Sequence, residues 1–228
     1  MAEGPRKVNW FAIWVSVGVV VALVAVAIFV VNLNNQAVDP GPGEAPSASN
    51  IDPDTGAILV GEGASNLETY IDFMCPVCNQ FEQIYGEDIA AMVDDGSITL
   101  GIHPISILDA QSQGTEYSTR AANAMYCVAV ADADASVPFM SAMFANQPQE
   151  GTPGLTDDVI LQIAESVGVT GIESCVNDGV YSDYVTAMTE ETPVRPGAGG
   201  IGTPTVLLNG EFVELTGDPE ADLRAALP

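Results

Sequence analysis

The sequence predicts an α/β domain that carries a helical insertion and follows a single N-terminal transmembrane helix. Three observations support this: an uncharged apolar run near the N-terminus, a strand–helix–strand pattern over residues 66–104, and two strands and a helix close to the C-terminus. Helical periodicity fills the region between the two strand-bearing parts, about residues 111–192. This order of periodicities is typical of a three-layer domain with helices packed on a sheet.

The apolar run, WFAIWVSVGVVVALVAVAIFVV, covers residues 10–31 and contains no charged residue. It is long enough for a helix to cross the roughly 30 Å hydrocarbon layer of a membrane. Arg6 and Lys7 precede it and no Lys or Arg follows until Arg120, so the positive-inside rule places residues 1–9 in the cytoplasm. A cleavable signal peptide is the alternative, but its apolar region is typically only about 7–15 residues long. We therefore expect a single-pass anchor in the cell membrane and an extracytoplasmic domain.

Residues 32–55 are rich in Pro, Gly, Ser, Asn and Ala and offer almost nothing to bury. Such a composition is typical of a flexible linker. We expect the folded domain to cover residues 56–228.

The chain is strongly acidic, with 31 Asp and Glu against five Lys and Arg and a formal net charge of −26. A surface of this charge repels phosphate backbones, so we expect no binding to nucleic acid. Solubility or adaptation to salt explains the charge most simply, and attraction of basic client proteins is a weaker alternative.

The strand–helix–strand unit begins with LETYIDFM, in which alternate apolar residues predict a strand. Cys75 ends this strand, and Pro76 suits a first helical turn because its missing N–H needs no partner there. The helix should continue to Gly96, a plausible C-terminal stop. The second strand is SITLGIHPI. We expect the apolar face of the helix to comprise Val77, Phe81, Ile84, Ile89 and Met92.

The later elements also carry local signals. EYSTRAANAMYCVAVADA, TDDVILQIAESVG and YSDYVTAMTEE are each predicted to be helical, and Thr156 is the expected N-cap of the second. TPTVLL and EFVEL flank Asn209-Gly210, a strong signal for a two-residue hairpin turn. Asp218-Pro219 should begin a last helix over Glu220–Leu227.

Cys75 and Cys78 are predicted to form a redox-active pair. A cysteine at a helix N-terminus has a lowered thiol pKa, because free N–H groups and the helix dipole favour the thiolate. A partner three positions later lies one turn away, within reach of a disulfide. A zinc site is a weaker alternative, because the chain has a single histidine, His103, and its other cysteines are far away in sequence. Two inert core thiols are the other alternative, and we expect neither a metal nor a cofactor.

Cys127 and Cys175 remain as a second pair within the predicted helical insertion. In an exported domain they most simply form a structural disulfide between two helices. A second redox pair that passes electrons to the first is the alternative.

Two segments in this order, DFMCPVCNQFE and GIGTPTVLLNGEFV, together with the helical block between them, resemble the DsbA-like branch of the thioredoxin superfamily. The resemblance covers residues 57–227 and is greatest to the membrane-anchored forms of Gram-positive and actinobacterial type. It implies a thioredoxin-like fold, in which a cis Thr203-Pro204 peptide bond packs beside the active site. In that family the first cysteine, here Cys75, is the exposed nucleophile, and the second, here Cys78, is the buried resolving thiol.

The resemblance also implies an activity and partners. The protein would introduce disulfides into exported, cysteine-containing client proteins, whose backbone would pair with Thr203, and a quinone-linked membrane partner would re-oxidise it. Val77 stands where the best-known oxidases have a histidine that stabilises the thiolate. We therefore expect helix N–H groups to supply most of the thiolate stabilisation, and we expect this protein to be a weaker oxidant than those enzymes. Thr69 replaces a buried acid of many members, while Asp72 matches a common acidic position and should be structural or modestly tuning.

Two other functions remain open from the sequence. A disulfide isomerase or reductase is one, because Thr before the cis proline also resembles isomerases, although those usually carry a dimerisation domain that we do not expect here. A non-catalytic binding module on the thioredoxin scaffold is the other. His103, at the end of a strand, is expected to be a hydrogen-bonding structural residue.

Overall fold

The computed structural model describes residues 43–227. The expected cytoplasmic segment, residues 1–9, and the expected anchor, residues 10–31, lie outside this range. Within it, no helix combines the length and apolar character needed to cross a membrane.

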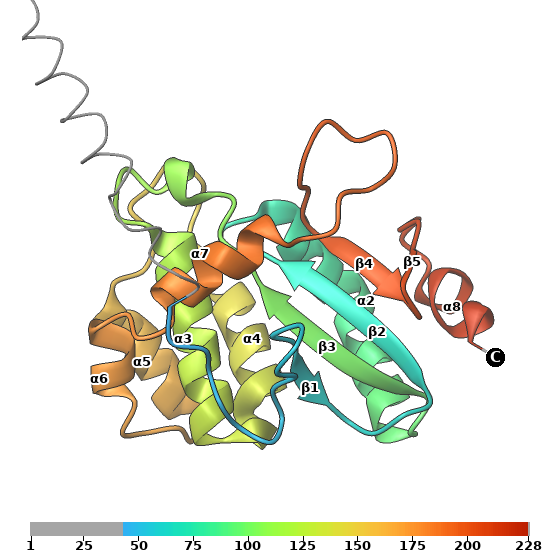
Figure 1. Ribbon diagram of the computed structural model, residues 1–228, viewed down its shortest axis with the longest axis horizontal. Coiled ribbons are helices and arrows are strands. Elements are labelled where there is room, and N and C mark those ends of the chain that lie inside the picture. Colours follow the sequence, from blue (N-terminus) through green and yellow to red (C-terminus); the bar gives the residue numbers. More distant parts are fainter. Residues whose placement is uncertain (1–42, 228) are drawn as a thin grey trace, which may run out of the picture. The chain divides into compact units, whose positions relative to one another are not determined.

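The described chain forms an α/β domain (Figure 1). The strands are β1 (Ile58–Val60), β2 (Ser65–Ile71), β3 (Ile98–Pro104), β4 (Thr205–Leu208) and β5 (Glu211–Phe212). The α-helices are α2 (Pro76–Asp94), α3 (Tyr117–Ala131), α4 (Ser136–Ala145), α5 (Asp157–Ser166), α6 (Glu173–Asn177), α7 (Ser182–Glu190) and α8 (Pro219–Asp222). Helices α3 to α7 form the predicted helical insertion between β3 and β4.

One five-stranded sheet, in the order β1-β3-β2-β4-β5, organises the domain. β2 and β3 are parallel, and the other neighbouring pairs are antiparallel. Parallel strands need a crossover, and α2 supplies it, lying across one face of the sheet (Figure 1). Tyr70 and Ile71 are adjacent on β2 and both buried, in different apolar clusters, so the sheet is covered on both faces.

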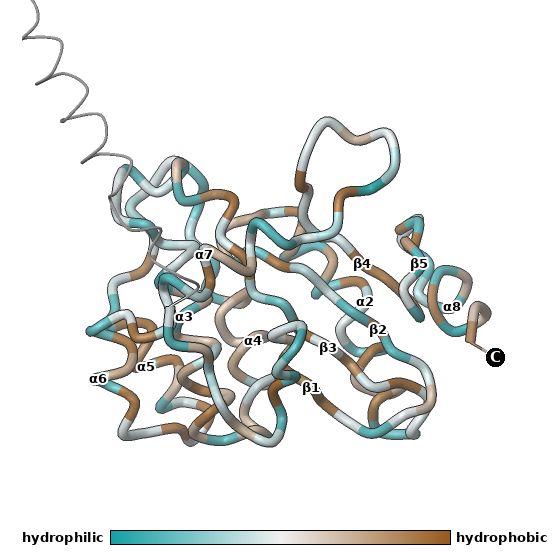
Figure 2. Tube along the Cα trace, viewed as in Figure 1, coloured by the Kyte–Doolittle hydropathy of each residue, from teal (hydrophilic) through white to brown (hydrophobic). Residues whose placement is uncertain are grey.

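Hydrophobic residues follow this arrangement along the chain. Figure 2 shows apolar colour along β4 and α4. All four residues of β4 are buried. The interior of the domain therefore lies between the sheet and the packed helices.

Helix α2 begins and ends where the sequence predicts, and Phe81, Ile89 and Met92 are buried as expected, but two other residues of the expected apolar face are not. Pro76 is its first residue, and Gly96 adopts a positive φ of 74° just beyond its end. Val77 and Ile84 are 54% and 46% exposed, so their assignment to the apolar face is wrong. The buried stripe is Cys78, Phe81, Tyr85, Ile89 and Met92. The inward stripe therefore includes Cys78 and Tyr85, which the apolar-residue pattern did not count.

The described part of the expected linker packs against the domain. Ile51 is only 7% exposed and forms an isolated β-bridge with Ile58. The Asn50 side chain donates from Nδ2 to the Ala129 carbonyl at 3.1 Å, and the Asn50 backbone carbonyl accepts from the Leu59 N–H at 2.7 Å. The folded region therefore extends upstream of the predicted boundary at residue 56, because a segment of linker-like composition still finds buried and hydrogen-bonded partners in the domain.

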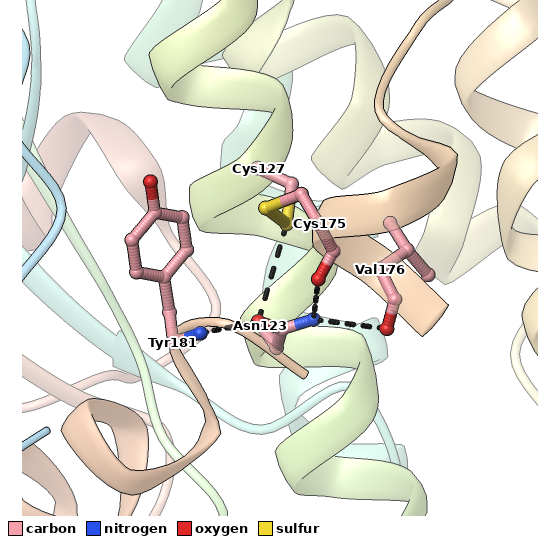
Figure 3. The surroundings of a disulfide bond; sticks show 5 residues. All are labelled: Asn123, Cys127, Cys175, Val176 and Tyr181. Carbon is pink, nitrogen blue, oxygen red and sulfur yellow. Dashed lines mark hydrogen bonds between the residues drawn. A yellow bond between two sulfur atoms is a disulfide. The ribbon is translucent and has the colours of Figure 1, made fainter. Parts of the chain in front are cut away.

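The structure joins Cys127 of α3 and Cys175 of α6 in a disulfide (Figure 3). Asn123, one turn before Cys127, supports the same junction. Its Nδ2 donates to the carbonyls of Cys175 and Val176 at 3.3 and 3.4 Å, and its Oδ1 accepts from the Tyr181 N–H at 2.8 Å. A covalent bond and a buried amide thus hold the same two helices together.

The structure confirms the predicted hairpin near the C-terminus, although its second strand, β5, covers only Glu211–Phe212 of the predicted EFVEL. Asn209 and Gly210 form the hairpin turn with φ of 51° and 82°, which confirms that prediction. The predicted helix over Glu220–Leu227 is wrong in part: α8 ends at Asp222, and a 3₁₀ turn covers Arg224–Ala226. Leu223 separates the two and buries its side chain, so tertiary packing interrupts a locally plausible helix.

Replacing both Cys127 and Cys175 with Ala should lower the free energy of unfolding by up to about 4 kcal/mol, because the unfolded chain would regain the freedom of the closed loop. Urea denaturation of the purified domain beginning at residue 43, compared with the unsubstituted domain, measures this. The pH dependence of Cys75 alkylation should stay unchanged. Equal stability of the two proteins would contradict the structural role.

Candidate active site

The Cys75-Pro76-Val77-Cys78 motif lies where β2 has ended and α2 begins. Cys75 is the N-cap residue of α2, and its N–H donates to the Asp72 carbonyl at 3.0 Å. The Cys75 carbonyl accepts from the Cys78 N–H at 3.1 Å. These contacts form the first turn of the helix around the two sulfur atoms.

The two thiols differ in exposure less than expected. Cys75 is 5% exposed and Cys78 is fully buried, so Cys75 is the more accessible of the two. The expectation of an openly exposed nucleophile is nevertheless wrong, because the surrounding loops cover most of Cys75. Pro76 and Val77, between them, are both exposed.

The loop before β4 closes the site from the opposite side. The Thr203-Pro204 peptide bond is cis, and the Cys75 thiol donates to the Thr203 carbonyl at 3.7 Å. The Thr203 hydroxyl donates to the Tyr70 carbonyl at 3.0 Å and lies 3.0 Å from the Cys78 sulfur. In this second contact either the hydroxyl or the thiol can be the donor. Thr203 therefore contacts both cysteines.

The surroundings shift the pKa values of the two thiols in opposite directions. The hydrogen bond from the Cys78 thiol, followed by those from the backbone N–H groups of Cys78 and Val77, lowers the pKa of Cys75 to about 7. Burial, followed by the contact with Cys75, raises the pKa of Cys78 well above its usual value. The largest single contribution comes from the neighbouring thiol, and the two helix N–H groups add to it. Cys75 is the thiolate near neutral pH, and Cys78 keeps its proton.

Asp72 is a fully buried carboxylate next to the motif. It accepts from the N–H groups of Met74 and Leu108 at 2.8 and 2.9 Å and from the Ser118 hydroxyl at 2.7 Å. Burial raises the pKa of Asp72 to about 6. Its charge in turn raises the pKa of Cys75, opposing the stabilising contacts. The predicted structural and tuning role agrees with this geometry.

Sequence reasoning did not identify Ser118 or Gln147 as neighbours of the site. Ser118 comes from α3 and Gln147 from the loop after α4, where Nε2 donates to the carbonyls of Phe73 and Cys75. Neither residue belongs to a recognisable motif, and both are 40 or more positions from the cysteine motif in sequence. Only the packing of the helical insertion brings them there.

His103 lies on β3, and its ring stacks on that of Tyr70 with centroids 4.1 Å apart. Its Nε2 is 3.6 Å from a carboxylate oxygen of Glu68 and has no hydrogen-bond partner among residues 43–227. Its packing is therefore mainly aromatic rather than the expected hydrogen bonding. No group of three His, Cys, Asp or Glu side chains within the same residues is arranged to hold a metal ion.

An acidic thiol at a helix N-terminus, a buried second thiol and a cis-proline loop on a mixed sheet define a thioredoxin-type site for thiol–disulfide exchange. Comparison with known proteins agrees. A family model described as thioredoxin matches residues 55–227. The DsbA of Mycobacterium tuberculosis, in its reduced crystal structure, is 31% identical, with a TM-score of 0.61 over 69% of this chain and 84% of that one. The reduced DsbG of the same organism is also 31% identical, with a TM-score of 0.63 over 79% and 85% of the two chains.

The chain therefore belongs to the thioredoxin family, in its DsbA-like branch, and is a thiol–disulfide oxidoreductase.

A region of the serine/threonine-protein kinase PknE of Mycobacterium tuberculosis is also similar, at 36% identity over 170 residues. The match covers 69% of this chain but only 29% of the kinase. The chain thus spans less than a third of the curated relatives it matches.

The alkylation rate of Cys75 should rise with pH around a midpoint near 7, because the thiolate is the reactive form and the pKa is lowered to about 7. Mass spectrometry that separates the Cys75 peptide from the Cys78 peptide measures this on the reduced protein. Cys78 should stay unlabelled over the same pH range. A Cys75 midpoint at the value of free cysteine, about 8.5, would contradict the assignment.

Asp72→Asn should lower the Cys75 midpoint by about half a unit or less, because it removes a nearby negative charge. The pKa of Asp72 is raised in the folded state, so its contribution to stability is largest below about pH 4 and is lost as the pH rises through about 6. The variant should lack this pH-dependent loss in chemical denaturation. Asp178→Asn, an exposed site in the helical insertion, is the control and should change neither measurement.

Proposed function

We propose that this protein is a membrane-anchored, extracytoplasmic oxidoreductase that introduces disulfides into exported proteins through Cys75 and Cys78. The observation that carries the proposal is the unequal acidity of the two thiols beside the Thr203-Pro204 loop. A thiolate that is stable at Cys75 makes the reduced form of the site favourable. A site with this preference tends to take electrons from a client.

The exchange follows from the geometry in two steps. A client thiolate attacks Cys75 of the Cys75–Cys78 disulfide, a bond forms between client sulfur and Cys75, and Cys78 leaves and takes up a proton. A second client thiolate then attacks the client sulfur of this mixed disulfide. Cys75 leaves as a thiolate, which its lowered pKa makes a good leaving group. The client loses two electrons and the Cys75–Cys78 pair gains them.

The carbonyl of Thr203 offers a place for the client backbone. It accepts only a long contact, 3.7 Å, from the Cys75 thiol, and this contact is lost when Cys75 enters a disulfide. An extended client segment could pair with this part of the loop as with the edge of a sheet. Such pairing would present the client sulfur to Cys75 without requiring a particular client sequence.

The proposed location rests on the uncharged residues 10–31 and on Arg6 and Lys7 before them. The Cys127–Cys175 disulfide supports it, because structural disulfides persist in oxidising compartments. Re-oxidation of Cys75 and Cys78 would require an electron acceptor, for which we propose a quinone-linked membrane partner. No nucleic-acid role is proposed, given the net charge of −26.

Cys78→Ala should accumulate mixed disulfides between Cys75 and client proteins, because no resolving thiol remains on the enzyme. Expression of the full chain in its native host, followed by non-reducing electrophoresis, would reveal reducible adducts. The matched variant Cys75→Ala should form none. Absence of adducts from Cys78→Ala would favour the non-catalytic binding module.

The reduction potential discriminates an oxidase from a reductase or isomerase. Equilibration with glutathione buffers should give a potential between that of the strong oxidase DsbA, about −120 mV, and that of thioredoxin, about −270 mV. A value at the thioredoxin end would instead favour the reductase alternative.

A further inference from the structure

One amide side chain from the helical insertion holds the backbone of the cysteine motif. Gln147 donates from Nε2 to the Phe73 carbonyl at 3.0 Å and to the Cys75 carbonyl at 2.9 Å. Its Oε1 accepts from Asn79 Nδ2 at 3.1 Å. The amide therefore bridges the turn that precedes the motif and the first residue after it.

The surrounding contacts set the orientation of this amide. Asn79 Nδ2 also donates to the Phe144 carbonyl at 3.1 Å, and Asn79 Oδ1 accepts from Gln83 Nε2 at 2.9 Å. The rings of Phe73 and Phe144 pack 5.1 Å apart, which holds the end of α4 against the turn. Gln147 must direct its NH₂ group at the two carbonyls and its oxygen at Asn79, because the reverse orientation would oppose acceptor to acceptor and donor to donor.

The Gln147 amide contacts the backbone next to the N–H groups that stabilise the Cys75 thiolate. The N–H groups of Val77 and Cys78 favour the Cys75 thiolate, and the Cys78 N–H also donates to the Cys75 carbonyl at 3.1 Å. Their direction depends on the peptide group between Cys75 and Pro76, whose carbonyl Gln147 holds. Because the same amide also holds the Phe73 carbonyl, it fixes the turn on both sides of Met74.

We propose that Gln147 is a positioning residue of the exchange site, which holds the turn from Phe73 to Cys75 so that the helix N–H groups face the nucleophilic sulfur. This inference rests on the proposed thiol–disulfide exchange at Cys75. It assigns a role in the chemistry to the loop after α4, which otherwise only connects two helices of the insertion.

The test compares Gln147→Ala, Gln147→Met and Gln147→Glu in the full chain solubilised in detergent. The Cys75 alkylation midpoint should rise by about one pH unit in the first two variants, because both lose the donors. It should rise further in Gln147→Glu, where a carboxylate faces two carbonyls and adds negative charge. A one-unit rise lowers the thiolate fraction at pH 6 about tenfold, and the greater nucleophilicity of a more basic thiolate restores roughly threefold, so alkylation should slow about threefold.

Asn146→Ala is the matched control, because Asn146 is exposed, adjacent to Gln147, and donates from its side chain to the Ala142 carbonyl of α4. Its midpoint should equal that of the wild type. Gln147→Met keeps most of the side-chain volume, so a wild-type midpoint in Gln147→Met would show that packing alone matters and would overturn the inference. Wild-type midpoints in both Gln147→Ala and Gln147→Met would overturn it as well.

The two proposals fail in different ways. A wild-type chain that, with Cys75 and Cys78 oxidised, leaves a reduced peptide with two cysteines unoxidised would overturn the proposed function, and this inference with it. An active wild type whose Gln147 variants keep its midpoint would overturn this inference alone.

Discussion

The parallel pairing of β2 with β3 is the constraint on which the site depends. Two parallel neighbours cannot be joined by a tight turn, so the chain must cross the sheet between them, and α2 is that crossing. A helix that starts where β2 has ended presents its free N–H groups at the carboxyl end of this central strand. Cys75 occupies the N-cap position there, so the topology of the backbone places a thiol where negative charge is favoured.

The acidity of that thiol is then a balance of opposing contacts. The Cys78 thiol and two backbone N–H groups favour the thiolate, whereas burial and the charge of Asp72 disfavour it. Asp72 cannot easily move away, because N–H groups of Met74 and Leu108 and the Ser118 hydroxyl hold it. The result is one thiol with a lowered pKa and one with a raised pKa within a single helical turn, so Cys75 rather than Cys78 is the reactive thiol near neutral pH.

The helical insertion does more than enlarge the domain. Ser118 of α3 binds Asp72 on one side of the turn before Cys75, and Gln147 after α4 binds the backbone on the other. The Cys127–Cys175 disulfide and Asn123 hold α6 against α3, so the helix that carries Ser118 is itself braced. The insertion thus supplies two of the contacts that surround the cysteine motif.

The features that depend on a few neighbouring residues could be predicted from the sequence. The start of α2 at Pro76, its end before Gly96, the Asn209-Gly210 turn and the Thr156 cap are all decided by backbone preferences within one turn. The exposure of Val77 and Ile84, the packing of residues 43–55 and the break at Leu223 could not, because each depends on what another part of the chain presents. The same holds for the site. The motif determines that a thiol lies at a helix start, and the family resemblance gave Thr203 beside it, but the small exposure of Cys75 and its neighbours Ser118 and Gln147 come from the packing of distant segments. Helix starts, caps and turns depend on consecutive residues, whereas the pKa and the exposure of a side chain depend on distances that only the folded chain sets.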